Sequence, residues 1–243
     1  MRKFGILALL VALGACSKHD PILPGARTSV FDSDAPVVLN EKIEHLPDVE
    51  TKNENSNCPY TRDASNVIWN GDKKIFSGFP TNNSVKSTHN PVCDAAGGFV
   101  YSGLTTGEVV KVNPKTRQIV WIADIYKPSN MTGGTSVLDI VAPVVLDKKS
   151  VYAGGLGDAF CRLDMQSGRK TWCTEISVAA PFVIAGPAAF VPASDNYLYA
   201  VRLRDGAIFW RSEISKTAAA EYANGIVTVG RDKFDAKSGK KTK

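Results

Sequence analysis

The residues best suited to catalytic or metal chemistry are cysteines and histidines, and their spacing provides no recognisable reactive site. No two cysteines form the CxxC arrangement of zinc sites, and no Gly-x-Ser-x-Gly marks a nucleophilic serine. Acidic side chains do not gather into an oxygen-rich set that would suit calcium. Three histidines lie in polar stretches: His19, His45 and His89. We therefore expect no catalytic residue, no metal site and no cofactor.

A glycine-rich stretch from Gly154 to Asp158 invites comparison with a phosphate-binding loop. It lacks the Lys-Ser/Thr pair of a P-loop, and no helical pattern follows it. We therefore predict a hairpin turn in which glycine supplies a positive φ.

Composition places the chain among globular proteins with β structure. Its 243 residues are 44% hydrophobic, and 20 glycines and 13 prolines separate many short apolar runs. The net charge of +5 falls to about +3 without Arg2 and Lys3. Such a weak field does not indicate a nucleic-acid partner.

The N-terminus has the pattern of an export signal. Arg2 and Lys3 precede an apolar run that is too short to span a bilayer. The run ends in Leu-Gly-Ala-Cys16, which resembles the lipobox of bacterial lipoproteins. The resemblance implies a signal peptide at residues 1–15 and lipidation of Cys16. Because Ser17 follows, it also implies an outer-membrane location facing the periplasm. A plain secretory leader is the alternative.

A repeat begins after a polar, proline-interrupted stretch at residues 16–60, which we interpret as a tether with a possible closing strand. Three segments of seventeen residues align without a gap, at 109–125, 160–176 and 198–214. Each has a tryptophan at its thirteenth position: Trp121, Trp172 and Trp210. Alternation places each tryptophan on the same strand face as the isoleucine four residues later, so this face should pack between sheets.

The repeats predict an all-β fold at residues 61–243. Spacings of 38 and 51 residues between tryptophans match four-stranded propeller blades. We expect a β-propeller of about four to five blades, either open or closed into a small irregular ring. A fourth copy at 231–243 keeps the turn at Ser238-Gly239 and stops where the tryptophan would come. This copy predicts a frayed tail after about Asp235, unless the run Val37 to Leu39 supplies its missing outer strand.

The segments SVYAGGLGDAFCRLDMQSGRKTW and NYLYAVRLRDGAIFW resemble the PQQ-type propeller repeat. Combined with the lipobox, the chain resembles the BamB family of outer-membrane propeller lipoproteins, with about half their usual number of blades. The resemblance implies a non-catalytic periplasmic scaffold that assists β-barrel assembly and binds a BamA-like partner, as a monomer within a complex. The alternative is a quinoprotein-like or small-ligand-binding propeller, although the adjacent cysteines common in such enzymes are missing.

Four cysteines remain beyond Cys16, and an even number can pair in an oxidising compartment. Cys161 and Cys173 should oppose each other on two antiparallel strands, within disulfide distance. Cys58 and Cys93 would form the second pair. Four buried thiols are the alternative.

An insertion between the first two repeats supplies the candidate partner loop. It surrounds Tyr126 and Met131, whose side chains offer apolar contacts. A solvated loop without a partner is the alternative.

Overall fold

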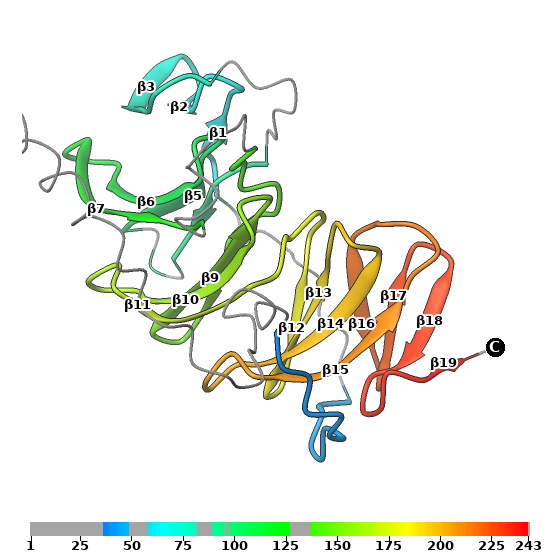
Figure 1. The fold of residues 1–243 in the computed structure, drawn as a ribbon. Coiled ribbons are helices and arrows are strands. Elements are labelled where there is room, and N and C mark those ends of the chain that lie inside the picture. The colour runs from blue at the N-terminus through cyan, green and yellow to red at the C-terminus, as the bar shows by residue number, and fades with distance from the viewer. Residues whose placement is uncertain are drawn as a thin grey trace, which may run out of the picture. The chain divides into compact units, whose positions relative to one another are not determined.

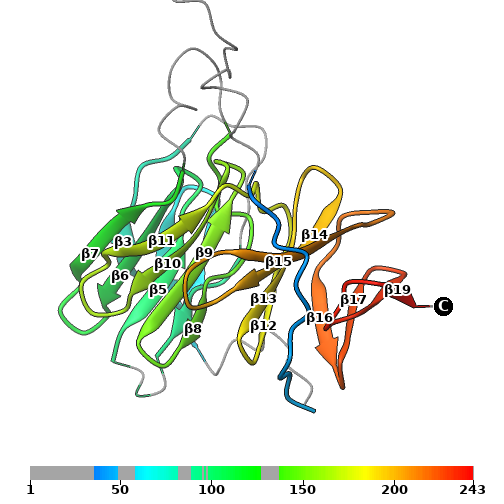
Figure 2. The same ribbon diagram turned by 60° about the horizontal axis from the view of Figure 1, so that its bottom comes forward.

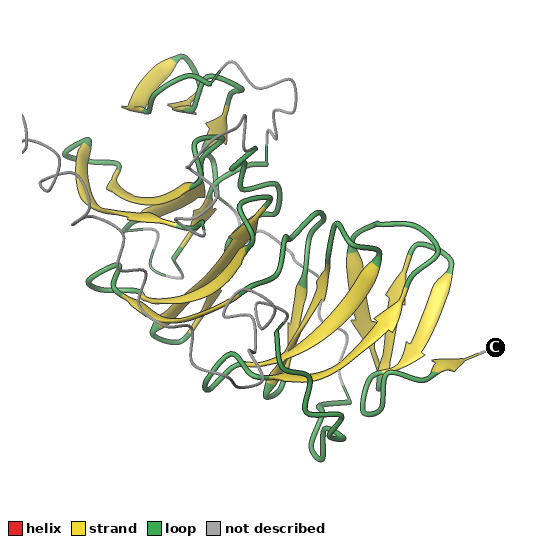
Figure 3. Ribbon diagram, in the orientation of Figure 1, coloured by secondary structure: helices red, strands yellow, loops and turns green. Residues whose placement is uncertain are grey.

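The computed structural model describes residues 36–48, 58–81, 89–94, 96, 98–126 and 137–242. Residues 34–243 belong to one compact unit. Every regular element within the described ranges is a β-strand (Figure 3). The described residues therefore include no helix that could cross a membrane.

The strands form five antiparallel sheets that follow one another along the chain (Figure 1). The first sheet contains β1 (Thr61–Arg62), β2 (Val67–Asn70) and β3 (Lys73–Ser77). The second contains β4 (Val92–Cys93), β5 (Val100–Gly103), β6 (Glu108–Asn113) and β7 (Gln118–Asp124). The third contains β8 (Val145–Asp147), β9 (Ser150–Gly155), β10 (Ala159–Asp164) and β11 (Lys170–Thr174). The fourth contains β12 (Val183–Ala185), β13 (Ala188–Pro192), β14 (Tyr197–Arg202) and β15 (Ile208–Glu213). The fifth contains β16 (Ala220–Ala223), β17 (Ile226–Val229), β18 (Asp232–Asp235) and β19 (Lys241–Thr242).

The predicted all-β, incomplete propeller is confirmed. Each sheet is a meander of strands in chain order, and no described strand pairing joins the first sheet to the fifth. Four sheets have four strands, whereas the described part of the first has three.

Two local features show which strands the first sheet contains. In the second, third and fourth sheets, the residue just before the third strand has a positive φ. Asn66, just before β2, also has a positive φ. The pairing of β2 with β3 also contains a register shift, and so does the pairing of the last two strands in each of those three sheets. We therefore equate β1, β2 and β3 with the second, third and fourth strands of the other sheets.

The glycine-rich stretch differs from the predicted hairpin. Gly154 and Gly155 lie within β9, and the residue with positive φ is Asp158. A Cβ on Gly154 would lie 2.5 Å from Val178 Cγ2, and one on Gly155 would meet the carbonyl oxygen of Asp139. These glycines permit close approach of neighbouring chain segments, and the turn itself uses another residue.

The predictions for the two chain ends were partly wrong. The fifth sheet has its own outer strand, because Phe234 of β18 pairs with Lys241 of β19. The tail is thus ordered beyond Asp235. Val38 does form a bridge, but it pairs in parallel with Ile208 of β15 in the fourth sheet. Figure 2 shows the segment 36–48 passing β15 and continuing towards the fifth sheet.

Candidate interaction surfaces

The three tryptophans join the second sheet to the third, the third to the fourth and the fourth to the fifth. Trp121 of β7 packs with residues of the third sheet in one apolar cluster. Trp172 of β11 does so with the fourth sheet, and Trp210 of β15 with the fifth. Ile125, Ile176 and Ile214 belong to the same three clusters. The predicted alternation therefore correctly identified the face that packs between sheets.

Each indole also donates a hydrogen bond to the same backbone position of the following sheet. Trp172 Nε1 lies 3.0 Å from the carbonyl oxygen of Leu203. The corresponding distances are 3.2 Å from Trp121 to Met165 and 3.2 Å from Trp210 to Ala236. These bonds satisfy the polar edge of a ring whose remaining surface is apolar.

The turn glycine of the following sheet makes room for the indole. Gly168, Gly206 and Gly239 all have positive φ. A Cβ on Gly206 would lie 2.7 Å from Trp172 Cε3, and Gly168 and Gly239 stand equally close to their tryptophans. Glycine is therefore required at this turn both for its backbone conformation and for its lack of a side chain.

A buried lysine reinforces the contact between the second and third sheets. Lys111 Nζ donates to the carbonyl oxygen of Met165 at 3.0 Å and lies 4.2 Å from the centre of the Phe99 ring. Burial lowers the pKa of this ammonium, while Asp94 and Asp164 oppose the change. Lys111 and Trp121 thus donate hydrogen bonds to the same carbonyl oxygen, that of Met165.

The contact between the first and second sheets lacks this arrangement. Gly78 N donates to Asn66 O just as Ile125 N donates to Gly107 O, which aligns Lys74 with Trp121. The register shift instead aligns the buried Phe76 with Trp121. The cluster between these sheets contains Ile68, Phe76 and Val110 but no tryptophan among the described residues. Arg117 replaces glycine at the receiving turn.

A disulfide joins the chain at this same contact. Cys58, just before β1, is bonded to Cys93 of β4, with their Cα atoms 5.2 Å apart. A covalent cross-link is therefore present where the indole contact is missing.

The second disulfide lies within a single sheet. Cys161 of β10 and Cys173 of β11 are directly paired, with Cα atoms 4.1 Å apart. It ties an outer strand to its neighbour, and Cys161 is also buried in the apolar cluster between the second and third sheets.

An exposed apolar patch covers the outer strand of the second sheet. Ile119, Val120 and Ile122 of β7 are 51%, 43% and 48% exposed. Our sequence reasoning missed them, although the run QIVWIAD is apolar on both strand faces and departs from alternation. The residues of β15 that correspond to Ile119 and Val120 in the repeat are Ile208 and Phe209. These two side chains are only 1% and 8% exposed.

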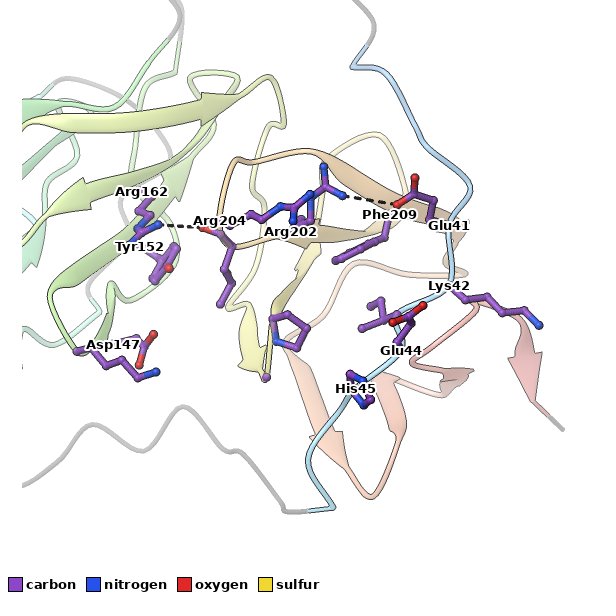
Figure 4. Close-up of a pocket in the computed structure, with 15 residues that line it drawn as sticks. Glu41, Lys42, Glu44, His45, Asp147, Tyr152, Arg162, Arg202, Arg204 and Phe209 are labelled. Carbon is purple, nitrogen blue, oxygen red and sulfur yellow. Dashed lines mark hydrogen bonds and ion pairs between the residues drawn. The ribbon is translucent and has the colours of Figure 1, made fainter.

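A pocket of about 660 Å³ lies where the segment 36–48 crosses the fourth sheet (Figure 4). Arg202 reaches Glu41 at 3.5 Å and Asp205 at 2.8 Å. Arg162, from the third sheet, donates to the carbonyl oxygen of Leu203 at 3.4 Å. Phe209 and Tyr152 supply apolar surface.

Charge pairing dominates the electrostatics of this pocket. The hydrogen bond from Arg202 lowers the pKa of Asp205 to about 2, and the Arg202 pKa rises in return. Asp205 is therefore ionised at neutral pH and neutralises part of the arginine charge.

The remaining predicted site residues are separate from these features. Tyr126 is partly buried, and its side chain lies against Gly107 and Gly157, so its ring packs on the second and third sheets. Cys16 and Met131 lie outside the described residues. Within the described ranges, no group of three or more His, Cys, Asp or Glu residues could hold a metal ion.

Four-stranded sheets joined by a repeated tryptophan define a PQQ-type propeller repeat protein. The family described as "Outer membrane protein assembly factor BamB" matches residues 26–212, which is most of the chain. The chain belongs to this family.

The relatives are distant. Outer membrane protein assembly factor BamB of Kangiella koreensis is 21% identical over 119 residues, which cover 49% of this chain and 31% of that protein. The crystal structure of BamB from Moraxella catarrhalis aligns with a TM-score of 0.56 at 12% identity, covering 81% of this chain and 66% of that one. This likeness establishes the fold alone, and the chain spans less than two thirds of either relative.

Proposed function

We propose that the protein is a non-catalytic periplasmic scaffold of the outer-membrane β-barrel assembly machinery. The observation that carries the proposal is the family match over residues 26–212, on sheets joined by the three tryptophan contacts. A series of sheets held together at fixed positions presents several strand edges and loops to a partner. The partner class we infer is a BamA-like barrel-assembly protein.

The proposed location is the periplasmic face of the outer membrane, with a lipid anchor on Cys16. Residues 16–60 would act as the tether in this arrangement. Multiple acyl chains on one cysteine hold a protein at a membrane surface without a spanning helix.

The test is purification of the full-length protein from membranes of the native host after chemical cross-linking. We expect a BamA-like protein in stoichiometric amounts, and loss of both membrane association and this partner in Cys16→Ala. A matched control is Cys161→Ala/Cys173→Ala, which retains the lipidation site. Recovery of the anchored protein without a barrel-assembly partner would overturn the proposed role.

A small-ligand-binding propeller is the second candidate, and the pocket at Arg202 favours it. Arg162, Arg202 and Arg204 line this pocket with Phe209 and Tyr152, which would suit an anionic, partly aromatic molecule. Glu41, Glu44 and Asp147 also line the pocket and offset part of this charge. Pyrroloquinoline quinone with calcium is the direct probe. Ligand at 100 times its dissociation constant stabilises a fold by about 2.7 kcal/mol, so an unchanged melting temperature would exclude tight binding.

A further inference from the structure

No described residue pairs with the outer edge of β7. The second sheet ends at β7, and no bridge or loop hydrogen bond from a described residue reaches that edge. Its side chains include the exposed patch Ile119, Val120 and Ile122. An apolar edge strand with unpaired backbone groups is a template for another strand.

The molecule itself shows what can occupy such an edge. On β15, Leu39 N donates to Ile208 O at 2.9 Å, and Glu41 N donates to Phe209 O at 3.0 Å. Ile208 and Phe209 stand two and one residues before Trp210, as Ile119 and Val120 do before Trp121. The pairing of each of these strands with its inner neighbour contains a register shift at the same repeat position. An extended segment therefore binds one of two equivalent edges.

Charge around the edge indicates the chemistry of the ligand. Exposed cations lie on the turn before β7, and on the outer strands of the sheets on either side or in the turns before those strands: Lys73, Lys74, Lys115, Arg117, Arg169 and Lys170. Exposed acids on or beside the same strands are fewer: Asp72, Asp124 and Glu175. On β15, the bound segment places Glu41 3.5 Å from Arg202 after its apolar run.

We propose that β7 binds an extended segment of a partner polypeptide by strand addition. The segment carries a short apolar run followed by acidic residues, as Val37 to Glu41 do in this chain. Its backbone pairs with the outer edge of β7, its apolar side chains cover Ile119, Val120 and Ile122, and its carboxylates face the basic rim. This surface goes beyond the barrel-assembly role and does not depend on it.

A designed peptide tests the proposal on the full-length protein. The probe is fluorescein-labelled Thr-Ser-Val-Val-Leu-Asn-Glu-Asp-Ser, and its control has proline in place of the second valine, which removes a backbone donor. We expect binding of the probe by fluorescence anisotropy and at least tenfold weaker binding of the control. Val120→Ser/Ile122→Ser should also weaken binding of the probe tenfold. Thr171 of β11 corresponds to Val120 in the repeat, and the control variant Thr171→Ser should leave binding unchanged.

Hydrogen exchange separates strand addition from simple adhesion. The probe should slow amide exchange within Gln118–Asp124 by at least tenfold, and Arg117→Ser should weaken binding two- to fivefold. Equal binding by Val120→Ser/Ile122→Ser would overturn the proposal. So would protected β7 amides in a probe-free monomer, because another part of this chain would then cover the edge. Self-association abolished by the same substitutions would assign the edge to a second copy instead.

Discussion

The contacts at the two ends of the sheet series are built differently. Between the fourth and fifth sheets, Trp210 is buried, donates to Ala236 and packs on Gly239. Between the first and second sheets, Phe76 packs in an apolar cluster without an indole among the residues described, Arg117 replaces the turn glycine, and the Cys58–Cys93 disulfide joins the chain there. The comparison teaches that neighbouring sheets pack through apolar clusters with or without an indole, and that the contact without the indole also has a covalent cross-link.

The largest expected effect is at the tryptophan contact. Trp210→Ala should lower the free energy of unfolding by about 3 to 5 kcal/mol, because it removes a large buried side chain and leaves a cavity. Trp69→Ala is the matched control in the first sheet, where the indole is partly exposed and bonds to Asp63. We expect roughly 1 to 2 kcal/mol there, in proportion to the smaller buried area. Equal losses of unfolding free energy in Trp210→Ala and Trp69→Ala, measured by urea titration, would contradict the difference between the two contacts.

The disulfide should matter most at the first contact. Cys58→Ser/Cys93→Ser opens a cross-link over a sequence separation of 35 residues, which is worth about 2 to 4 kcal/mol. Hydrogen exchange should accelerate in β1, β2 and β3 and stay unchanged in the fifth sheet. Cys161→Ser/Cys173→Ser is the control, because that bond lies within one sheet. Faster exchange spread evenly over all sheets would contradict this assignment.

The turn glycine should be the next most sensitive position. Gly206→Ala places a methyl group against Trp172 and strains a residue at φ +79°, so we expect a loss of about 2 to 3 kcal/mol. Gly71→Ala is the control, since φ is +55° there but nothing lies within 4 Å of the added carbon. Its expected loss is about 1 kcal/mol. Thermal melting of both variants provides the measurement.

The smallest expected effect concerns the outer strand of the fifth sheet. Asp232 accepts hydrogen bonds from Lys241 Nζ at 2.5 Å and Ser215 N at 2.6 Å, and the bond from Lys241 is the main reason why its pKa is lowered from 3.8. A lowered pKa stabilises the fold above the unfolded value and loses this contribution as pH falls through the folded value. Asp232→Asn should therefore cost about 1 to 2 kcal/mol at pH 7.

Acid titration checks the sign of that effect. The difference in melting temperature between wild type and Asp232→Asn should shrink as pH falls below about 3.8. A difference that stays constant from pH 7 to pH 2 would show that the lost stability does not come from the ionised carboxylate.

The sequence was sufficient for features that repeat. The fixed spacing of Trp121, Trp172 and Trp210 predicted the sheets and the packed face, because alternation along a strand is a local property. The antiparallel register likewise places Cys161 opposite Cys173. Exposure of β7 and docking of Val38 on β15 could not be predicted, since both depend on which neighbour covers an outer strand. Gly154 was misinterpreted because its constraint comes from Val178, a distant residue.

The indole contact has a direction, since the third and fourth sheets each give a tryptophan to the next sheet and receive one on their own turn. Head-to-tail interfaces of this kind extend without limit when both ends stay complementary. At the receiving end, Gly71 of the first sheet has open space around it. At the giving end, the repeat position of the tryptophan in the fifth sheet is Lys243. Lysine at this position supplies no indole, so the contact that joins the second sheet through to the fifth is not repeated at residue 243.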